Sequence, residues 1–290
     1  MTHRVLTRAS SLATLASCPG LFYAQGEGGM GGRSAAANTG SAVGRAIELA
    51  HAGALLDDAL RSVTAEAPER WPAADLEQVA KWAFAYCCDP RNGPHSPYGT
   101  VVPGSCEREV ECDLPASPGD PSGEPFRVVG HLDQLRRDPQ GRLRVWDVKS
   151  GRPGGQELVL QYAWQLAAYA LASTATVGET VLPGGIIRLR GYDKVPYMDP
   201  AAREHAEVAA VFYPVQWSLD DCRNMLLSAA GELGRVRAGY IHLRPGLHCL
   251  YCPVGGAAGP AGCGDRLPDF VQSGSALPAA LAAAEWGEFA

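Results

Sequence analysis

Long apolar runs are absent from this chain of 290 residues. No stretch approaches the roughly 18 consecutive apolar residues that suggest a membrane-spanning helix, so we expect no membrane partner. The first residues do not combine a charged start with an apolar run, so we expect no secretory signal peptide. These absences favour a cytoplasmic protein, either in a bacterium or, if the protein is phage-encoded, in the cytoplasm of the host.

The motifs of nucleotide-driven motors are absent as well. The sequence has no Gly-Lys-Ser or Gly-Lys-Thr phosphate-binding loop, no helicase motif and no internal repeat. The missing loop excludes a motor that moves by hydrolysing ATP unaided. The length and a hydrophobic content of 46% suit one large globular domain, which we expect over residues 1–270, followed by a flexible tail at 271–290.

The chain also lacks an excess of positive charge, because its formal net charge is -6. Phosphate contacts favour Lys and Arg, so this balance is unfavourable for a nucleic-acid enzyme, although local charge matters more than the sum. Basic residues do gather in the middle third and near the last cysteines. We interpret them as candidate phosphate contacts or, alternatively, as a solvated face: Arg136, Arg137, Arg142, Arg144, Arg152, Arg188, Arg190, Lys194, Arg235, Arg237 and Arg244.

A β-hairpin is predicted near the middle of the chain. Residues 127–135 and 143–148 alternate as strands do, and a turn at 138–141 separates them. Pro139 fits the second position of a type I turn, and Gly141 fits the left-handed position that closes a three-residue hairpin loop. We therefore expect Asp138 to pair with the residue directly after this glycine.

This register places four polar side chains on one face of the hairpin. Asp133 lies opposite Asp147, His131 lies opposite Lys149, and residues two apart on a strand share a face. Two carboxylates this close repel each other unless a cation lies between them. Mg²⁺ prefers such hard oxygen ligands beside a substrate phosphate. Lys149 could orient or deprotonate the attacking water, or neutralise charge on the phosphate.

A helix that follows the hairpin carries two further polar residues. Gln165 and Tyr169 are four residues apart within the predicted helix 158–172, so they share one helix face. A helix edge with Tyr169 packed in the core is the alternative interpretation. We expect the remaining elements to be helices at about 40–56, 73–88 and 218–238 and strands at about 105–113, 181–190 and 208–215.

These residues resemble the motifs of the PD-(D/E)XK nuclease superfamily, specifically its RecB-type branch. That branch carries Gly-x-x-Asp, then Asp-x-Lys-x-Gly, then Gln-x-x-x-Tyr, which here are Gly130/Asp133, Asp147/Lys149/Gly151 and Gln165/Tyr169. The resemblance implies an α/β fold with a restriction-endonuclease-like core, in which a mixed central sheet is flanked by helices. It also implies that Asp133 and Asp147 bind Mg²⁺ or Mn²⁺, that Lys149 is catalytic, and that Gln165 and Tyr169 line the site and contact DNA.

One residue of the branch pattern is missing. The branch usually adds a metal-binding His from an N-terminal helix, and the corresponding position here holds Gly44. Glu48 or His51 could substitute for this ligand, or either could be a solvated helix residue. His131 is another candidate for the site, and His131 and Arg152 are candidate DNA contacts.

The nine cysteines include a Cys-x-x-Cys pair near the C-terminus. An odd count in a reducing compartment makes disulfides an unfavourable interpretation. Cys249 and Cys252 have the spacing of metal ligands, with Cys263 beyond them and Cys18 far upstream. This layout resembles the CRISPR-associated and AddB-type iron–sulfur exonucleases, which implies a 4Fe-4S cluster on these four cysteines. Zn²⁺ with His242 or His248, and unligated thiols, are the alternatives.

Two functions are compatible with these observations. The first is a metal-dependent DNA exonuclease acting on single-stranded ends, in DNA recombination or repair, phage DNA processing or CRISPR adaptation; 5′-to-3′ polarity is implied only by the resemblance. The second is a catalytically weak iron–sulfur DNA-binding subunit of a recombination or adaptation complex. Single-stranded DNA, proteins of such a complex and a second copy of the chain are the candidate partners.

Overall fold

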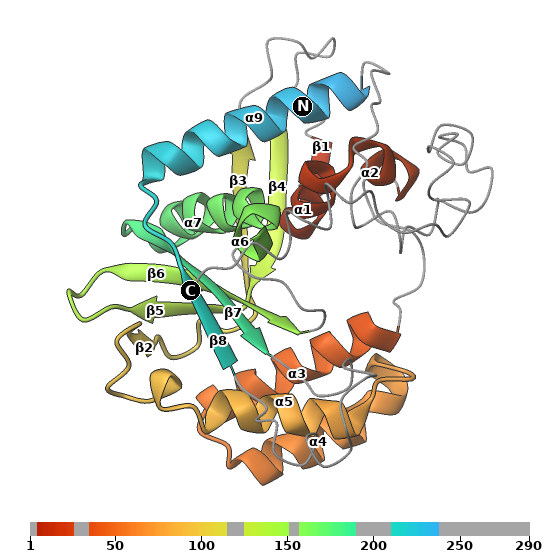
Figure 1. Cartoon of the computed structure of the whole chain (residues 1–290), viewed down its shortest axis with the longest axis vertical. Helices are drawn as coiled ribbons and strands as arrows, with labels where there is room; N and C mark the ends of the chain where they lie inside the picture. Colours follow the sequence, from red (N-terminus) through yellow and green to blue (C-terminus); the bar gives the residue numbers. More distant parts are fainter. Residues whose placement is uncertain (1–4, 26–34, 115–124, 151–156, 190–209, 238–290) are drawn as a thin grey trace, which may run out of the picture.

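The computed structural model describes residues 5–25, 35–114, 125–150, 157–189 and 210–237 (Figure 1). In chain order its elements are β1 (Val5–Arg8), α1 (Ala9–Ser17), α2 (Pro19–Gln25), α3 (Ala35–His51), α4 (Leu56–Arg70), α5 (Leu76–Cys87), a 3-10 turn (Pro90–Asn92), β2 (Thr100–Val101), β3 (Arg108–Leu114), β4 (Phe126–Leu132), β5 (Gln134–Arg137), β6 (Leu143–Ser150), α6 (Glu157–Gln161), α7 (Ala163–Val177), β7 (Val181–Leu189), β8 (Ala210–Pro214) and α9 (Leu219–Arg237). None of the helices in this described part is long and apolar enough to cross a membrane.

The strands form two mixed sheets. The smaller sheet has the order β1-β4-β3, and the larger has the order β2-β5-β6-β7-β8. β1 runs parallel to β4 and β6 runs parallel to β7, whereas the other neighbours are antiparallel. The predicted α/β class with mixed strands flanked by helices is confirmed. The strands divide into two sheets that meet where β4 ends and β5 begins.

Helices cover both faces of the larger sheet (Figure 1). Side chains of neighbouring residues on a strand point to opposite faces. In β7, Ile186 packs with Leu166 of α7, whereas Ile187 belongs to the apolar cluster formed with α3, α4 and α5. α9 packs in turn on the outer side of α7, where it also contacts α1. The larger sheet is therefore enclosed between α7 and the layer formed by α3, α4 and α5.

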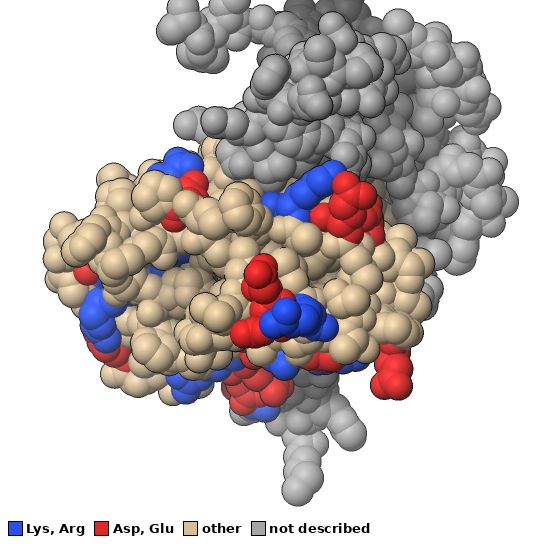
Figure 2. All heavy atoms as spheres, turned by 90° about the horizontal axis from the view of Figure 1, so that it is seen from below, with Lys and Arg blue, Asp and Glu red and all other residues tan. Residues whose placement is uncertain are grey.

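Helix α4 was not predicted from the sequence. Its buried side chains are only Ala59, Val63 and Ala67, so its apolar stripe is narrow and gives a weak periodic pattern. Its exposed surface carries ion pairs within the helix, such as Arg70 with Glu66. Figure 2 views this helical layer from below and shows acidic and basic side chains interspersed over it. The helix is held by packing against α3 and α5.

The predicted hairpin turn is confirmed, and so is the predicted register of the residues next to the turn. The backbone N–H of Asp138 donates to the carbonyl of Arg142 at 2.9 Å, and that of Gly141 donates to the carbonyl of Asp138 at 2.8 Å. Gly141 has a φ of 80°, as the left-handed position of the loop requires. The ladder runs from Arg137 opposite Leu143 to Gln134 opposite Trp146.

The ladder ends at Gln134 opposite Trp146, so neither the expected pair of Asp133 with Asp147 nor that of His131 with Lys149 forms. The chain bends at Asp133, and β4 pairs with β3 and β1 instead of with β6. His131 therefore lies opposite Glu109, and Lys149 lies opposite Arg188. The prediction that His131 faces Lys149 across the hairpin is wrong, because the bend moves β4 into the other sheet.

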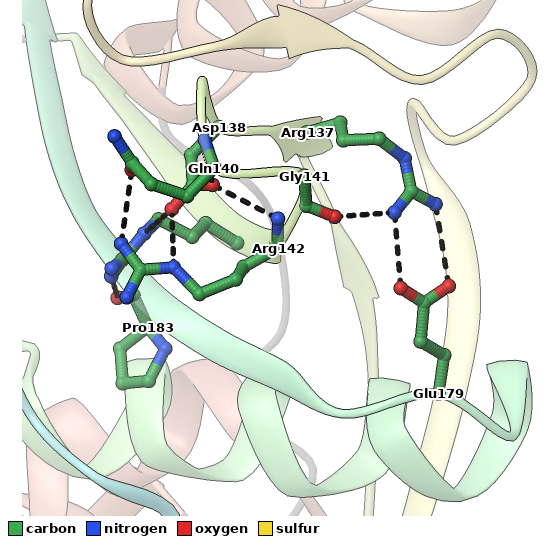
Figure 3. A network of polar contacts seen from close by, with 8 residues as sticks. Arg137, Asp138, Gln140, Gly141, Arg142, Glu179 and Pro183 are labelled. Carbon is green, nitrogen blue, oxygen red and sulfur yellow. Dashed lines mark hydrogen bonds and ion pairs between the residues drawn. The ribbon is translucent and has the colours of Figure 1, made fainter.

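Asp138 anchors the hairpin turn (Figure 3). Its carboxylate accepts hydrogen bonds from Arg142 Nε at 2.9 Å and Arg144 Nε at 2.8 Å, and from the backbone N–H of Gln140 at 3.0 Å. Burial by itself raises the pKa of Asp138, but the hydrogen bonds from Arg144 and Arg142 outweigh it and hold the pKa at about 2. The charged form is therefore the one that stabilises the turn.

We expect Asp138→Asn to remove part of the acid sensitivity of folding. A carboxyl group whose pKa is lower in the folded than in the unfolded chain stabilises the fold above its unfolded pKa of about 3.9. That contribution, about 1–2 kcal/mol, is lost as the pH falls from about 4 towards about 2. Urea unfolding at pH 7 and at pH 3 measures it. Equal pH dependence in the variant and the wild type would contradict this assignment.

Candidate functional site

The centre of the site is an acid and a lysine on β6. Asp147 is fully buried, and Lys149 Nζ lies 2.8 Å from Asp147 Oδ2 and 3.0 Å from Oδ1. The two residues are two apart on one strand, so their side chains share a face. Burial by itself lowers the pKa of Lys149, but the charges of Asp147 and Asp133 outweigh it and raise the pKa above its ordinary value. Lys149 is therefore a cation at neutral pH.

Helix α7 supplies the wall of the site above Asp147. Gln165 Nε2 donates to Asp147 Oδ1 at 3.2 Å and lies at the same distance from Tyr169 Oη. The ring centroid of Tyr162, the residue before the helix, lies 4.7 Å from Lys149 Nζ. The structure thus brings Gln165 and Tyr169 together with the acid and the lysine, and adds Tyr162, which the sequence did not indicate.

Asp133 joins the site from the bend between the two sheets. Its Oδ2 accepts a hydrogen bond from the backbone N–H of Val148, which places this carboxylate next to Asp147 along β6. Burial, and then the charge of Asp147, raise the pKa of Asp133 well above its usual value. The two acids therefore repel each other in the metal-free protein, and a cation between them would relieve that repulsion.

Gly130 is required by the close approach of α7. A Cβ atom at position 130 would lie 2.8 Å from Cε1 of Tyr169 and 3.1 Å from Cβ of Ala9. The glycine therefore lets the tyrosine ring lie directly on β4. Burial, and then the charge of Asp147, raise the pKa of Tyr169 above its ordinary range, so its hydroxyl stays protonated.

The donor set of the site fits a hard divalent cation. Asp133 and Asp147 offer carboxylate oxygens, and the buried Oε1 of Gln165 has no hydrogen-bond partner among the described residues. In the same described part, no three His, Cys, Asp or Glu side chains lie close enough together to hold a metal ion by themselves. Two protein carboxylates completed by water and substrate oxygens is the arrangement that Mg²⁺ commonly adopts.

The candidates for an additional ligand on α3 have other partners. Glu48 Oε2 accepts a hydrogen bond from Arg45 Nη1 at 2.8 Å. His51 Nε2 lies 2.9 Å from the hydroxyl of Tyr86. Burial, and then the charge of Arg136, lower the pKa of His51 to about 4, so its imidazole is neutral at physiological pH.

Glu107 is a residue near the site that the sequence analysis missed. It directly precedes β3 and has a φ of 53°, a left-handed backbone that side chains other than glycine rarely adopt. Its Oε1 would lie 3.1 Å from a Cβ atom placed on Gly44 of α3. A single Glu before a strand carries no recognisable pattern, and this unusual φ cannot be read from the sequence.

Several predicted residues lie outside the described part of the chain. These are Gly151 and Arg152 after β6 and the C-terminal cysteines Cys249, Cys252 and Cys263. Cys18 is described: it is buried between α1 and α2, and its Sγ accepts a hydrogen bond from the backbone N–H of Leu21 at 3.4 Å. The cysteine cluster therefore stays a prediction.

Comparison with known proteins identifies a family over most of the chain. A family model described as the PD-(D/E)XK nuclease superfamily matches residues 9–257. A solved structure titled "Crystal structure of SSO0001" is similar over 90% of this chain and 89% of its own, with 12% identity and a TM-score of 0.36. No curated protein matches the sequence.

Proposed function

Because this chain belongs to the PD-(D/E)XK nuclease superfamily, we propose that it is a metal-dependent DNA exonuclease that acts on single-stranded ends. The observation that carries this proposal is the convergence of Lys149 and Gln165 on the buried carboxylate of Asp147, beside Asp133. The 5′-to-3′ polarity, and roles in recombination, repair, phage DNA processing or CRISPR adaptation, rest on the motif resemblance alone.

Each side chain receives a role from its contacts. Asp133 and Asp147 would hold Mg²⁺ or Mn²⁺, which when bound polarises the phosphate and makes a bound water more acidic. Lys149 is held as a cation by Asp147 and Asp133, so it would neutralise charge that develops on the phosphate. Two residues of α7 complete the site. Gln165 donates a hydrogen bond to Asp147 and so orients its carboxylate. Tyr169 stays protonated and can donate a hydrogen bond to a DNA phosphate.

The cysteines belong to a second part of this proposal. We place a 4Fe-4S cluster on Cys18, Cys249, Cys252 and Cys263, with Zn²⁺ as the alternative metal. Such a cluster would connect the two ends of a single domain spanning residues 1–270. Protein purified without oxygen should then absorb near about 400 nm, as thiolate-ligated iron–sulfur clusters do.

The test of the proposed function is cleavage of single-stranded DNA labelled at its 5′ or 3′ end, with Mg²⁺, with Mn²⁺ and with a chelator. We expect cleavage only with metal, and a mononucleotide released early from one labelled end. Release of internal fragments would replace the exonuclease with an endonuclease. A protein that binds the strand but never cleaves it would support the alternative, an iron–sulfur DNA-binding subunit.

A further inference from the structure

The register of β3 with β4 brings a third carboxylate to the metal site. The last paired residues of this ladder are Arg108 and Leu132. The next residues on the two strands are Glu107 and Asp133, and the ladder does not continue to them. The two residues are nevertheless near each other, because the charge of Glu107 contributes to the raised pKa of Asp133. The bend at Asp133 and the left-handed backbone of Glu107 lie at this shared point.

Gly40 and Gly44 of α3 have no side chains, and this leaves space for Glu107. A Cβ atom on Gly40 would lie 2.9 Å from Oγ of Ser150 at the end of β6, and one on Gly44 would lie 3.1 Å from Oε1 of Glu107. These glycines are four residues apart, hence on one face of the helix. That face therefore runs from the end of the strand that carries Asp147 to the carboxylate of Glu107.

Glu107 lies close enough to Asp133 and Asp147 for the three charges to act on one another. Burial, and then the charges of Glu48 and Asp147, raise the pKa of Glu107, while His131 and Lys149 act in the opposite direction. The charge of Glu107 contributes in turn to the raised pKa of Asp133. The charges of Glu107, Asp133 and Asp147 therefore act on one another, and a divalent cation would relieve their repulsion.

A separate observation also indicates a ligand at this site. Gln165 is 2% exposed, its amide nitrogen contacts Asp147, and its Oε1 has no hydrogen-bond partner among the described residues. A buried amide oxygen without a partner is costly, so it indicates a group that is not part of the protein, such as water on a bound ion.

We propose that Glu107 is the third carboxylate of the metal site and binds the divalent cation through one of its water molecules. This inference rests on the proposed metal site at Asp133 and Asp147. Mg²⁺ usually keeps several waters, so an outer carboxylate can orient a bound water. Glu107 would thereby supply the metal contact that the RecB-type branch obtains from a His at the position held here by Gly44.

The test is a calorimetric titration of the full chain with Mn²⁺, without DNA. We expect Glu107→Gln to weaken Mn²⁺ binding about 10- to 100-fold, as loss of an outer-shell partner does. Glu111→Gln is the matched control, because Glu111 lies on the same β3, is exposed and pairs with the half-buried Arg127. An affinity for Mn²⁺ in Glu107→Gln equal to that of Glu111→Gln would overturn the proposal.

Thermal unfolding gives a second measurement. With a chelator present, Glu107→Gln should melt at a higher temperature than the wild type, because one of three repelling carboxylates is gone. With Mn²⁺ present, it should gain less stability than the wild type gains. A variant that is less stable in both conditions would show a merely structural role and contradict the inference.

Asp147→Asn in the same titration separates this inference from the proposed function. Loss of binding in Asp147→Asn but not in Glu107→Gln would refute only the role of Glu107. Unchanged binding in Asp147→Asn, or no binding in the wild type, would refute the metal site on which both proposals depend.

Discussion

Replacing Asp147 with Asn should reduce DNA cleavage by roughly 10³-fold or more, with little change in the fold. The amide keeps the size of the side chain and can still accept the hydrogen bond from Gln165. It removes the negative charge that would bind the metal and that lies 2.8 Å from Lys149 Nζ. Single-turnover cleavage of end-labelled single-stranded DNA at saturating Mn²⁺ measures the effect.

The control for this variant is Asp220→Asn. Asp220 lies in the first turn of α9, its side chain is 83% exposed, and its ion partner is the exposed Arg223. Circular dichroism and the melting temperature should show that both variants fold. If Asp147→Asn cleaves DNA at the wild-type rate while folded, the active site assigned to β6 is wrong.

Replacing Gly185 with Ala should destabilise the protein by about 4 kcal/mol or more. Gly185 lies in β7 between β6 and β8 and has a φ of 146°, which side chains rarely tolerate. A Cβ atom there would lie 2.1 Å from the carbonyl oxygen of Tyr213 on the neighbouring strand, so either the backbone of β8 or that of β7 must move. The free energy of unfolding in urea measures the loss.

Gly178→Ala is the matched control for this strand glycine. Gly178 ends α7 in the left-handed conformation, with a φ of 74°, and a Cβ atom would meet no atom within 4 Å. Gly178→Ala should therefore lower the free energy of unfolding only by the cost of a left-handed backbone at alanine, about 1–2 kcal/mol. Equal destabilisation by the two substitutions would show that crowding at β8 is not the decisive effect.

The hairpin could be predicted because its determinants are local. Pro139 and Gly141 define the turn, and the alternation of apolar residues sets which side chains share a face. The observed pairs Gln134 with Trp146 and Arg137 with Leu143 follow the predicted register. The spacing of Asp147 and Lys149, and that of Gln165 and Tyr169, likewise follow from the strand and helix periods alone.

The bend at Asp133 could not be predicted from the alternating pattern. Residues 127–135 alternate as one continuous strand, yet β4 pairs in the smaller sheet and β5 in the larger. The alternation of apolar and polar residues predicts which face of a strand is buried. It does not predict which strand pairs with it, because the pairing partners are distant in the sequence. The same limit explains why His131 was placed opposite Lys149.

The sequence by itself determined the turn, the helix and strand periods, and the acidic, basic and amide groups that give the site its chemistry. The tertiary structure decided the rest: the crossing from one sheet to the other at Asp133, the approach of α3 to the end of β6, and the position of Glu107 beside Gly44. Short-range patterns depend on backbone geometry within a few residues. Contacts between distant segments depend on how whole layers pack, and no single segment encodes them.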